Sequence, residues 1–160
     1  MNIGIIIHSQ SGHTAALAKA IAGKFRQNNH EVTIKSLQTS GLTKPGSRHF
    51  SISNTPDEEE MEGFDIILFG GPVWAFKASP VIMEYLRWLK KLNGKKALSF
   101  VTMGFPYKSL GGTRALRSMN EEIKASGGTI LPGEILHYFF GFNKLKLQEA
   151  VESIYKNVTG

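Results

Sequence analysis

Short apolar runs alternate with stretches of helical periodicity along the whole chain, and this alternation restricts the fold more than any other feature. The apolar runs predict strands over five segments, namely Ile3–Ile7, Val32–Leu37, Ile66–Phe69, Ala97–Met103 and Thr129–Phe139. Strands that alternate with helices indicate a parallel sheet covered on both faces by right-handed crossovers. We therefore predict an α/β fold, a doubly wound three-layer domain with a five-stranded parallel sheet.

The stretches between the strands predict the helices. Apolar residues recur at helical spacing over Leu17–Phe25, Ile82–Leu89, Leu116–Ile123 and Leu147–Val158. Ser79 and Pro80 suit the N-cap and first position of the second of these helices, and Gly127-Gly128 follows the third.

The second crossover lacks a clear pattern. Residues 38–55 show no periodicity, so we predict a long loop and then a short helix over Pro56–Glu62, capped by Asn54 or Thr55. A loop of this length is either functional or mobile, and the sequence leaves both open.

Composition narrows the class of protein. The 160 residues suit a single domain over 1–160, and the absence of cysteine excludes disulfides, thiolate metal sites and cysteine nucleophiles. The N-terminus has no basic region before its first strand, and no apolar run approaches the ~20 residues that span a bilayer. We expect a cytoplasmic protein without a membrane span or a metal site, and the sequence leaves open whether it forms a homo-oligomer.

The net charge of +6 is unevenly distributed. Between Lys77 and Arg117 nine Lys and Arg residues face one acid, Glu84, whereas residues 57–62 read DEEEME. A basic balance is compatible with nucleic acids, acidic membranes or anionic small molecules as partners. The basic stretch RWLKKLNGKK is most simply a helix C-terminus followed by a solvated turn. Because the cations lack interleaved aromatic residues on one continuous surface, we do not expect a nucleic-acid partner.

The end of the first strand, HSQSGHT at residues 8–14, carries unusual hydrogen-bonding capacity. Gly12 permits close backbone approach, the next helix offers unpaired N–H groups, and Ser9, Ser11 and Thr14 add hydroxyls. Together they predict a phosphate cradle that needs no lysine. An ordinary capped turn also favours these residue types, so the motif alone leaves that alternative open.

Two further strand ends carry glycine and aromatic residues. Residues 69–80, FGGPVWAFKASP, are predicted to leave the sheet at Gly70-Gly71-Pro72 and to place Trp74 and Phe76 in a loop. Residues 103–113, MGFPYKSLGGT, add aromatic side chains beside glycines. Aromatic residues in loops are costly to expose unless a flat group covers them, although they also fold back as satellite core.

Several nucleotide-binding classes are excluded. The chain has no GxxxxGK[ST], so a nucleoside triphosphatase is not expected, and it lacks the three spaced glycines of a dinucleotide fingerprint. It also lacks the aspartates of a phosphoryl-accepting receiver domain.

These three strand ends together resemble those of the flavodoxin-like FMN-binding family. HSQSGHT resembles that family's phosphate loop, roughly [ST]-x-[ST]-G-[NH]-T, and GGPVW and the glycine-rich stretch after the fourth strand resemble its second and third FMN loops. The resemblance spans nearly the whole chain and implies a short-chain flavodoxin-like sheet with order 2-1-3-4-5. It departs from the common pattern where Trp-Ala-Phe-Lys stands in place of paired aromatic residues followed by Gly-Asn.

The resemblance implies FMN as the cofactor and assigns the residues that hold it, without naming a catalytic residue. The phosphate is expected on Ser9, Gln10, Ser11, Gly12, His13 and Thr14. One side of the isoalloxazine is expected against Pro72, Val73, Trp74, Ala75 and Phe76, with Trp74 as the stacking ring. The other side is expected against Met103, Gly104, Phe105, Tyr107, Gly111 and Gly112.

Charge separates the two functional hypotheses. Acidic electron carriers of this family disfavour the anionic reduced flavin, whereas here Lys77 and Lys108 lie in the predicted ring loops. We therefore expect an oxidoreductase that passes electrons from NAD(P)H through FMN to a quinone or similar small acceptor. The alternative is a non-enzymatic electron-transfer protein that docks a redox partner protein.

Overall fold

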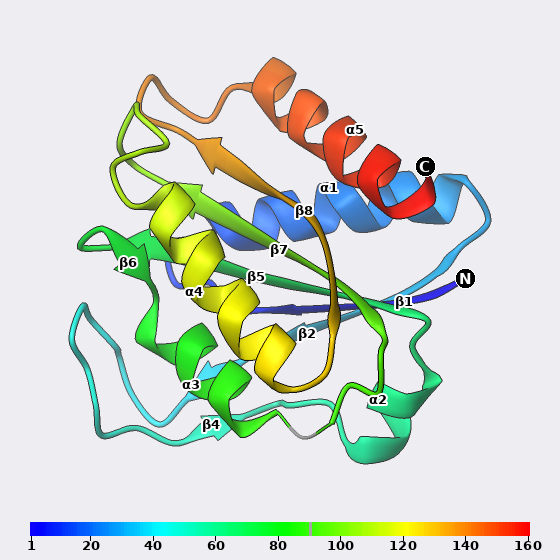
Figure 1. Cartoon of the computed structure of the whole chain (residues 1–160). Coiled ribbons are helices and arrows are strands. Elements are labelled where there is room, and N and C mark those ends of the chain that lie inside the picture. Colours follow the sequence, from blue (N-terminus) through cyan, green and yellow to red (C-terminus); the bar gives the residue numbers. More distant parts are fainter. Residues whose placement is uncertain (90) are drawn as a thin grey trace.

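A parallel sheet between two layers of helices forms the centre of the computed structural model, which describes residues 1–89 and 91–160. The parallel strands are β1 (Asn2–Ile7), β2 (Glu31–Ser36), β5 (Ile66–Trp74), β7 (Lys96–Met103) and β8 (Thr129–His137). Their order in the sheet is β2-β1-β5-β7-β8, as Figure 1 shows. The predicted doubly wound sheet with order 2-1-3-4-5 is therefore confirmed.

The helices cover both faces of this sheet. One face carries α1 (His13–Gln27) and α5 (Lys144–Thr159), and the other carries α3 (Pro80–Trp88) and α4 (Gly112–Ala125) (Figure 1). At the start of α3 the Ile82 N–H donates to Ser79 Oγ at 3.3 Å, with Pro80 in the first turn. This confirms the predicted cap.

The short helix α2 (Glu58–Gly63) corrects a predicted cap. The Glu60 N–H donates to Asp57 Oδ1 at 2.8 Å, and the Asp57 N–H donates to Glu60 Oε2 at 3.1 Å, so Asp57 forms a capping box. The prediction of Asn54 or Thr55 as the cap is wrong. Asn54 instead has a left-handed φ of 58° and donates from its side chain to the Ser36 carbonyl.

Three two-residue strands form antiparallel pairs in the loops at one end of the sheet. β3 (Gln38–Thr39) and β4 (Ile52–Ser53) pair in antiparallel fashion, so they close the stretch that the sequence left without structure. β6 (Lys77–Ala78) pairs in antiparallel fashion with the end of β5.

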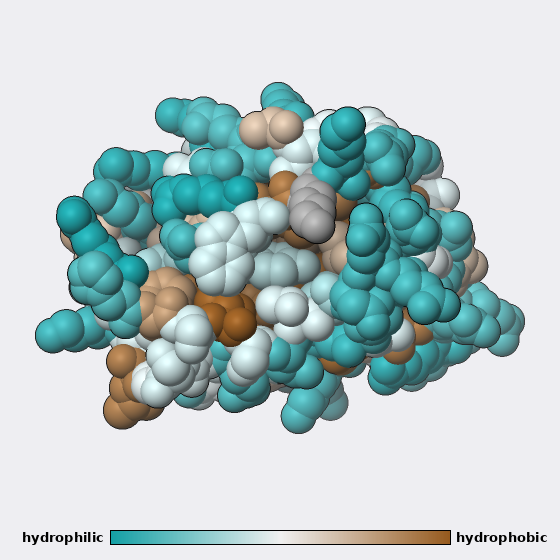
Figure 2. All heavy atoms as spheres, turned by 90° about the horizontal axis from the view of Figure 1, so that it is seen from below, coloured by the Kyte–Doolittle hydropathy of each residue, from teal (hydrophilic) through white to brown (hydrophobic). Residues whose placement is uncertain are grey.

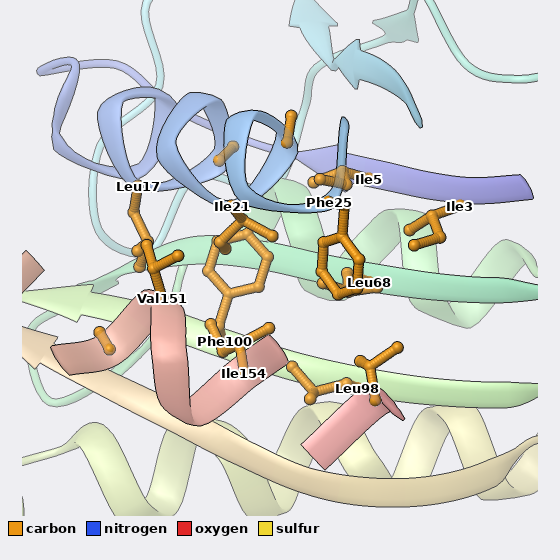
Figure 3. Close-up of a cluster of buried hydrophobic side chains, with 14 of the residues drawn as sticks. Ile3, Ile5, Leu17, Ile21, Phe25, Leu68, Leu98, Phe100, Val151 and Ile154 are labelled. Atoms are coloured by element: carbon orange, nitrogen blue, oxygen red, sulfur yellow. The ribbon is translucent and has the colours of Figure 1, made fainter. Parts of the chain in front are cut away.

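Two hydrophobic clusters fill the spaces between the layers. The first lies between the sheet and the α1–α5 pair and includes Phe25, Leu68, Phe100 and Ile154, all without exposed surface (Figure 3). The second includes Phe69, Ile82 and Met119 under α3 and α4. Burying such a side chain contributes about 1.5–3 kcal/mol, so both clusters fix the strands and hence the loops that follow them.

β8 and α3 both end before their predicted limits. β8 ends at His137, so Phe139 lies outside the strand, and α3 ends at Trp88. Of the predicted basic helix end, Arg87 lies in the last turn of α3, Lys91 lies beyond the helix, and Lys90 lies outside the described residues. Figure 2 shows a face on which hydrophilic residues predominate and hydrophobic ones form small separate areas. Among the described residues, no helix combines the length and the apolar character that crossing a membrane requires.

Candidate functional site

The loops that follow the parallel strands meet at one end of the sheet, on the left of Figure 1. We call these residues the carboxyl-edge loops, and they are 8–12, 37–51, 75–76, 104–111 and 138–143. In open α/β sheets ligands bind outside the carboxyl ends of the strands, next to the point where the strand order reverses. Here the order reverses beside β1, so the loop between β1 and α1 lies at the centre of the edge.

The first loop presents free backbone donors. Gly12 precedes α1 with a left-handed φ of 96°, and the Ala15 N–H donates to Ser9 Oγ at 3.1 Å. In the described part of the chain, the backbone N–H groups from Ser9 to Thr14 have no hydrogen-bond acceptor. Unpaired amides at a helix N-terminus, where the dipole is positive, form an anion-binding site.

The side chains of the first loop are partly engaged with neighbours. Thr14 is buried, and its hydroxyl forms a hydrogen bond of 2.8 Å with the Thr102 hydroxyl. The Ser11 hydroxyl lies 3.0 Å from His13 Nδ1. The loop therefore offers mainly backbone N–H groups outward, while its side chains hold it in shape.

The long second crossover is attached to this first loop. Thr43 is buried, and its hydroxyl donates to Gln10 Oε1 at 3.1 Å. Residues 37–51 therefore lie beside the phosphate loop predicted from the sequence, although the sequence left their role open. The contact restrains the side-chain amide of Gln10.

The second predicted loop is a β-hairpin rather than an excursion from the sheet. β5 continues through Gly70 and Gly71 to Trp74, so the prediction that Gly-Gly-Pro turns the chain out is wrong. A Cβ on Gly70 would lie 2.2 Å from the Phe100 ring, so this glycine serves packing within the core. The chain instead reverses at Ala75 and Phe76, which have left-handed φ values of 46° and 63°.

Trp74 and His8 connect the hairpin to the first loop. The two rings meet edge to face with centroids 5.2 Å apart, and His8 Nδ1 lies 2.9 Å from the hydroxyl of Ser79. His8 is buried, and this burial lowers its pKa from 6.5 to about 4, so the imidazole is neutral at physiological pH. Sequence reasoning missed His8, although its place at the end of a buried strand was visible.

The third loop contacts the tip of the hairpin. Gly111 has a left-handed φ of 108°, and a Cβ at this position would lie 2.6 Å from the Phe76 Cα, so only glycine permits this approach. The rings of Phe76 and Phe105 stack with centroids 5.2 Å apart and an interplanar angle of 21°. Both rings are nearly half exposed. The two loops predicted to flank a planar ring therefore face each other.

The space between these two loops is closed in this arrangement. A planar ring between two aromatic rings needs about 7 Å, twice the van der Waals contact distance. Phe76 and Phe105 must therefore separate for a ring to enter between them. Two hollows of the described surface lie elsewhere, one between α4 and β8 near Arg117 and the other beside α2.

The predicted site residues divide into those at the surface of the edge and those behind it. Exposed at the edge are Gln10, Ser11, Gly12, Ala75, Phe76, Phe105 and Tyr107. Half-buried are Ser9, His13, Val73, Trp74 and Gly104. Buried behind the loops are Thr14, Pro72, Met103, Gly111 and Gly112, whose positions shape the loops rather than present side chains to a ligand.

A further loop with aromatic residues follows β8, and the site predicted from the sequence did not include it. Tyr138 stacks on His13 with ring centroids 3.8 Å apart and an interplanar angle of 8°, and Phe142 also approaches His13. The signal in the sequence was YFFGF at residues 138–142, which the predicted strand absorbed in part. Loop 138–143 thereby forms a side wall next to the first loop.

The carboxyl-edge loops contain basic residues but no acidic ones. None of the 13 acidic residues of the chain lies in the carboxyl-edge loops. Lys77 is exposed at the hairpin, and Lys108 in the third loop lies 3.8 Å from Glu134 of β8. The arrangement can hold an anion on the amides of the first loop and a flat apolar group against the aromatic residues beside it.

Comparison with solved structures identifies the architecture. Oxidised flavodoxin 1 from Bacillus cereus superimposes with a TM-score of 0.72 over 99% of this chain and 97% of its own, at 18% identity. This chain has the flavodoxin fold. A flavodoxin of Streptococcus pneumoniae TIGR4 likewise gives a TM-score of 0.72 at 15% identity, over 99% of this chain and 97% of that chain.

The same fold occurs in a protein that is not named as a flavodoxin. A putative quinone reductase from Klebsiella pneumoniae gives a TM-score of 0.61 at 14% identity, over 98% of this chain and 83% of that one. No protein-family model and no curated protein sequence matches this chain. At these identities the comparisons establish the fold, and the chemistry must be argued from the site.

Proposed function

We propose that this protein binds FMN at the carboxyl edge of its sheet and acts in electron transfer. The observation that carries the proposal is the meeting, at one edge, of a loop with free backbone amides and two loops with facing aromatic rings. The sequence resemblance to flavodoxin-like FMN proteins and the flavodoxin fold support the same assignment.

The residues present suit the two ends of FMN. The N–H groups of residues 9–14 would donate hydrogen bonds to the phosphate oxygens, and the positive end of the α1 dipole would offset the phosphate charge. The isoalloxazine would lie against the hairpin tip and the third loop. Their exposed rings, Phe76 and Phe105, are better placed to meet it than Trp74, which is half-buried against His8. Bound FMN would supply the redox chemistry, taking up electrons from a donor and passing them to an acceptor.

The protein groups around the ring would set its environment. Phe76 and Trp74 of the hairpin and Phe105 of the third loop would shield the ring from water. His8 would contribute a neutral imidazole because burial lowers its pKa. Lys77 adds positive charge that favours a reduced, anionic flavin, although its exposure weakens the effect through solvent screening.

We further propose that the protein is an oxidoreductase that takes electrons from NAD(P)H and delivers them to a quinone or similar small acceptor. The absence of acidic residues from the carboxyl-edge loops supports this proposal, because a positive edge attracts an anionic dinucleotide. The alternative is an electron carrier that docks a redox partner protein. It is favoured by the nearly complete mutual coverage between this chain and the flavodoxins.

Titration of the purified protein with FMN and with riboflavin tests cofactor binding. We expect quenching of flavin fluorescence at micromolar protein, with riboflavin much weaker because it lacks the phosphate that the first loop binds. Absence of quenching by FMN would refute the proposal, and equal affinities would show that the first loop is not the phosphate site. Stopped-flow mixing of the FMN-loaded protein with NADH or NADPH then separates the two functions, because a carrier shows no rapid reduction of the flavin.

A further inference from the structure

An exposed apolar surface continues beyond the proposed flavin site. Phe140 is 81% exposed, Leu145 63% and Phe139 54%, and these residues lie together in the loop after β8 and the first turn of α5. The Phe139 and Phe140 rings are nearly perpendicular, with centroids 4.9 Å apart. Large apolar side chains that are exposed together indicate an interaction surface, and the proposed flavin contacts do not account for these three.

Loop 104–111 extends this surface. A Cβ on Gly104 would lie 3.6 Å from the Tyr138 ring, so the loops after β7 and β8 are adjacent. Tyr107 is 67% exposed at the same edge. The apolar residues therefore belong to two neighbouring loops that project beyond the ends of the strands at the upper left of Figure 1.

Cations accompany these apolar residues. Lys144 and Lys146 flank Leu145, and Lys44, Arg48, Lys77 and Lys108 lie in or next to the other carboxyl-edge loops. No acidic residue lies in these loops. At the opposite end of the sheet, by contrast, the acids of α2 lie near Lys95, whose Nζ donates to the Glu62 carbonyl, so that end carries both signs.

The first turn of α5 carries charges of the unfavourable sign. Lys144 and Lys146 occupy this turn and no acid accompanies them, although a helix N-terminus favours acids and disfavours cations. Asn143 caps the helix by accepting the N–H groups of Leu145 and Lys146. Lys146 is half-buried with its Nζ 3.1 Å from His137 Nε2, whereas Lys144 is exposed. An external anion beside Lys144 would offset the unfavourable charge at this helix end, which is an argument for an anionic partner independent of the exposed rings.

We infer that the loop after β8 and the start of α5 bind the surface of an anionic lipid bilayer. Aromatic and leucine side chains on a projecting loop can enter the interfacial layer, while the lysines around them reach the anionic headgroups. Phe139 and Phe140 lie in a turn directly after β8 and are both more than half exposed, so both rings are accessible to such a layer. This mode of binding lays the carboxyl edge on the bilayer.

The inference concerns a protein surface and does not depend on FMN. The experiment is co-sedimentation of the whole protein, with and without added FMN, with vesicles of phosphatidylcholine alone or mixed with phosphatidylglycerol. We expect binding to the anionic vesicles in both forms, weakening as salt is raised. Loss of binding only when FMN is withheld would overturn the independence of the surface from the flavin site.

Two pairs of variants localise the contact. The double variant Phe139→Ser/Phe140→Ser should weaken vesicle binding by about tenfold or more, because two apolar side chains no longer enter the interface. Trp88→Ser, which removes a 53% exposed aromatic residue from the end of α3, should leave binding unchanged. Lys144→Glu should weaken binding by more than about fivefold, whereas Lys156→Glu, which changes the net charge equally at the far end of α5, should have little effect.

Thermal unfolding of each variant checks that it folds, and the two lysine variants test the inference even if the double variant does not fold. Equal binding to neutral and anionic vesicles, or equal loss with Lys144→Glu and Lys156→Glu, overturns it. Retention on immobilised polyglutamate without binding to any vesicle also overturns it and assigns the surface to an acidic protein instead.

Discussion

The two ends of the proposed flavin site differ in how far they are formed in advance. The first loop is open, with backbone N–H groups from Ser9 to Thr14 that have no acceptor among the described residues. The hairpin tip and the third loop are closed on each other, with Phe76 stacked on Phe105 and Gly111 against the Phe76 backbone. The first loop can bind an anion without rearranging. The hairpin tip and the third loop must move apart before a planar ring can bind between them.

This difference assigns the two regions different roles in binding. A preformed cradle costs little to organise, so it should contribute most of the affinity. A closed pair of rings must first lose its own contact, so it should limit the rate of association. The left-handed Ala75 and Phe76 at the hairpin tip store strain that is compatible with such a movement.

Gly12→Val should give the largest effect, a loss of FMN affinity of at least about a hundredfold. A Cβ here meets nothing within 4 Å, so the effect comes from the left-handed φ of 96°, which costs about 1–3 kcal/mol in other residues and misdirects the amides. Fluorescence titration measures it. Gly12→Asn tolerates this φ and should retain much of the affinity, and Gly23→Ala in α1 serves as the control. An unchanged FMN affinity in Gly12→Val would disprove the preformed cradle.

His8 joins the two regions, and its titration should change stability. Its pKa is about 4 in the folded protein and near 6.5 when unfolded, so below pH 6.5 the unfolded chain binds a proton that the folded chain does not. Stability contributed by neutral His8 should therefore fall between about pH 6.5 and pH 4, by up to about 3 kcal/mol. Urea unfolding across this range measures it. His8→Asn, which does not titrate, should show a shallower decline, and an identical decline would contradict the assignment.

Removing one ring of the stacked Phe76–Phe105 pair should affect the affinity for FMN and the rate of FMN association in opposite directions. Phe105→Ala should weaken FMN by about tenfold, because stacking is worth about 1–3 kcal/mol per ring, yet it should speed association. Stopped-flow fluorescence measures both quantities. Trp74→Ala tests the stacking ring expected from the sequence. If it weakens FMN more than Phe76→Ala and Phe105→Ala, the flavin lies against Trp74, and an unchanged association rate in Phe105→Ala would refute the closed pair.

The smallest expected effect concerns the redox potential. Lys77→Glu should make the midpoint potential of bound FMN more negative, on the order of tens of millivolts, because it replaces a nearby cation with an anion. The effect of Lys108→Glu on the potential is harder to attribute to one charge, because Lys108 lies 3.8 Å from Glu134 and the substitution also removes that ion pair. Redox titration followed in the visible spectrum measures the shift, with Lys156→Glu as the charge-matched control. Equal shifts in Lys77→Glu and Lys156→Glu would show that the charge of Lys77 does not act locally.

Much of the fold could be predicted because its causes are local. Alternating apolar runs and helical periodicity give the strands and helices, and the Ser79-Pro80 cap follows from adjacent residues. The boundaries that failed depended on contacts across the fold. β5 runs past Gly70-Gly71-Pro72 because neighbouring β7 continues to pair with it and the Phe100 ring occupies the space at Gly70. The pattern of the sequence alone cannot show such a neighbour.

The sequence by itself determined that hydrogen-bonding residues follow the first strand and that aromatic residues follow the third and fourth predicted strands. This was possible because the ends of the strands follow from local apolar patterns and the residue types are given directly by the sequence. Only the tertiary structure decided which of these groups meet: Phe76 with Phe105, His8 with Trp74 and Ser79, Thr43 with Gln10, and His13 with Tyr138. These pairs are far apart in sequence and are brought together by the order of strands in the sheet, a property that the packing of the whole core fixes.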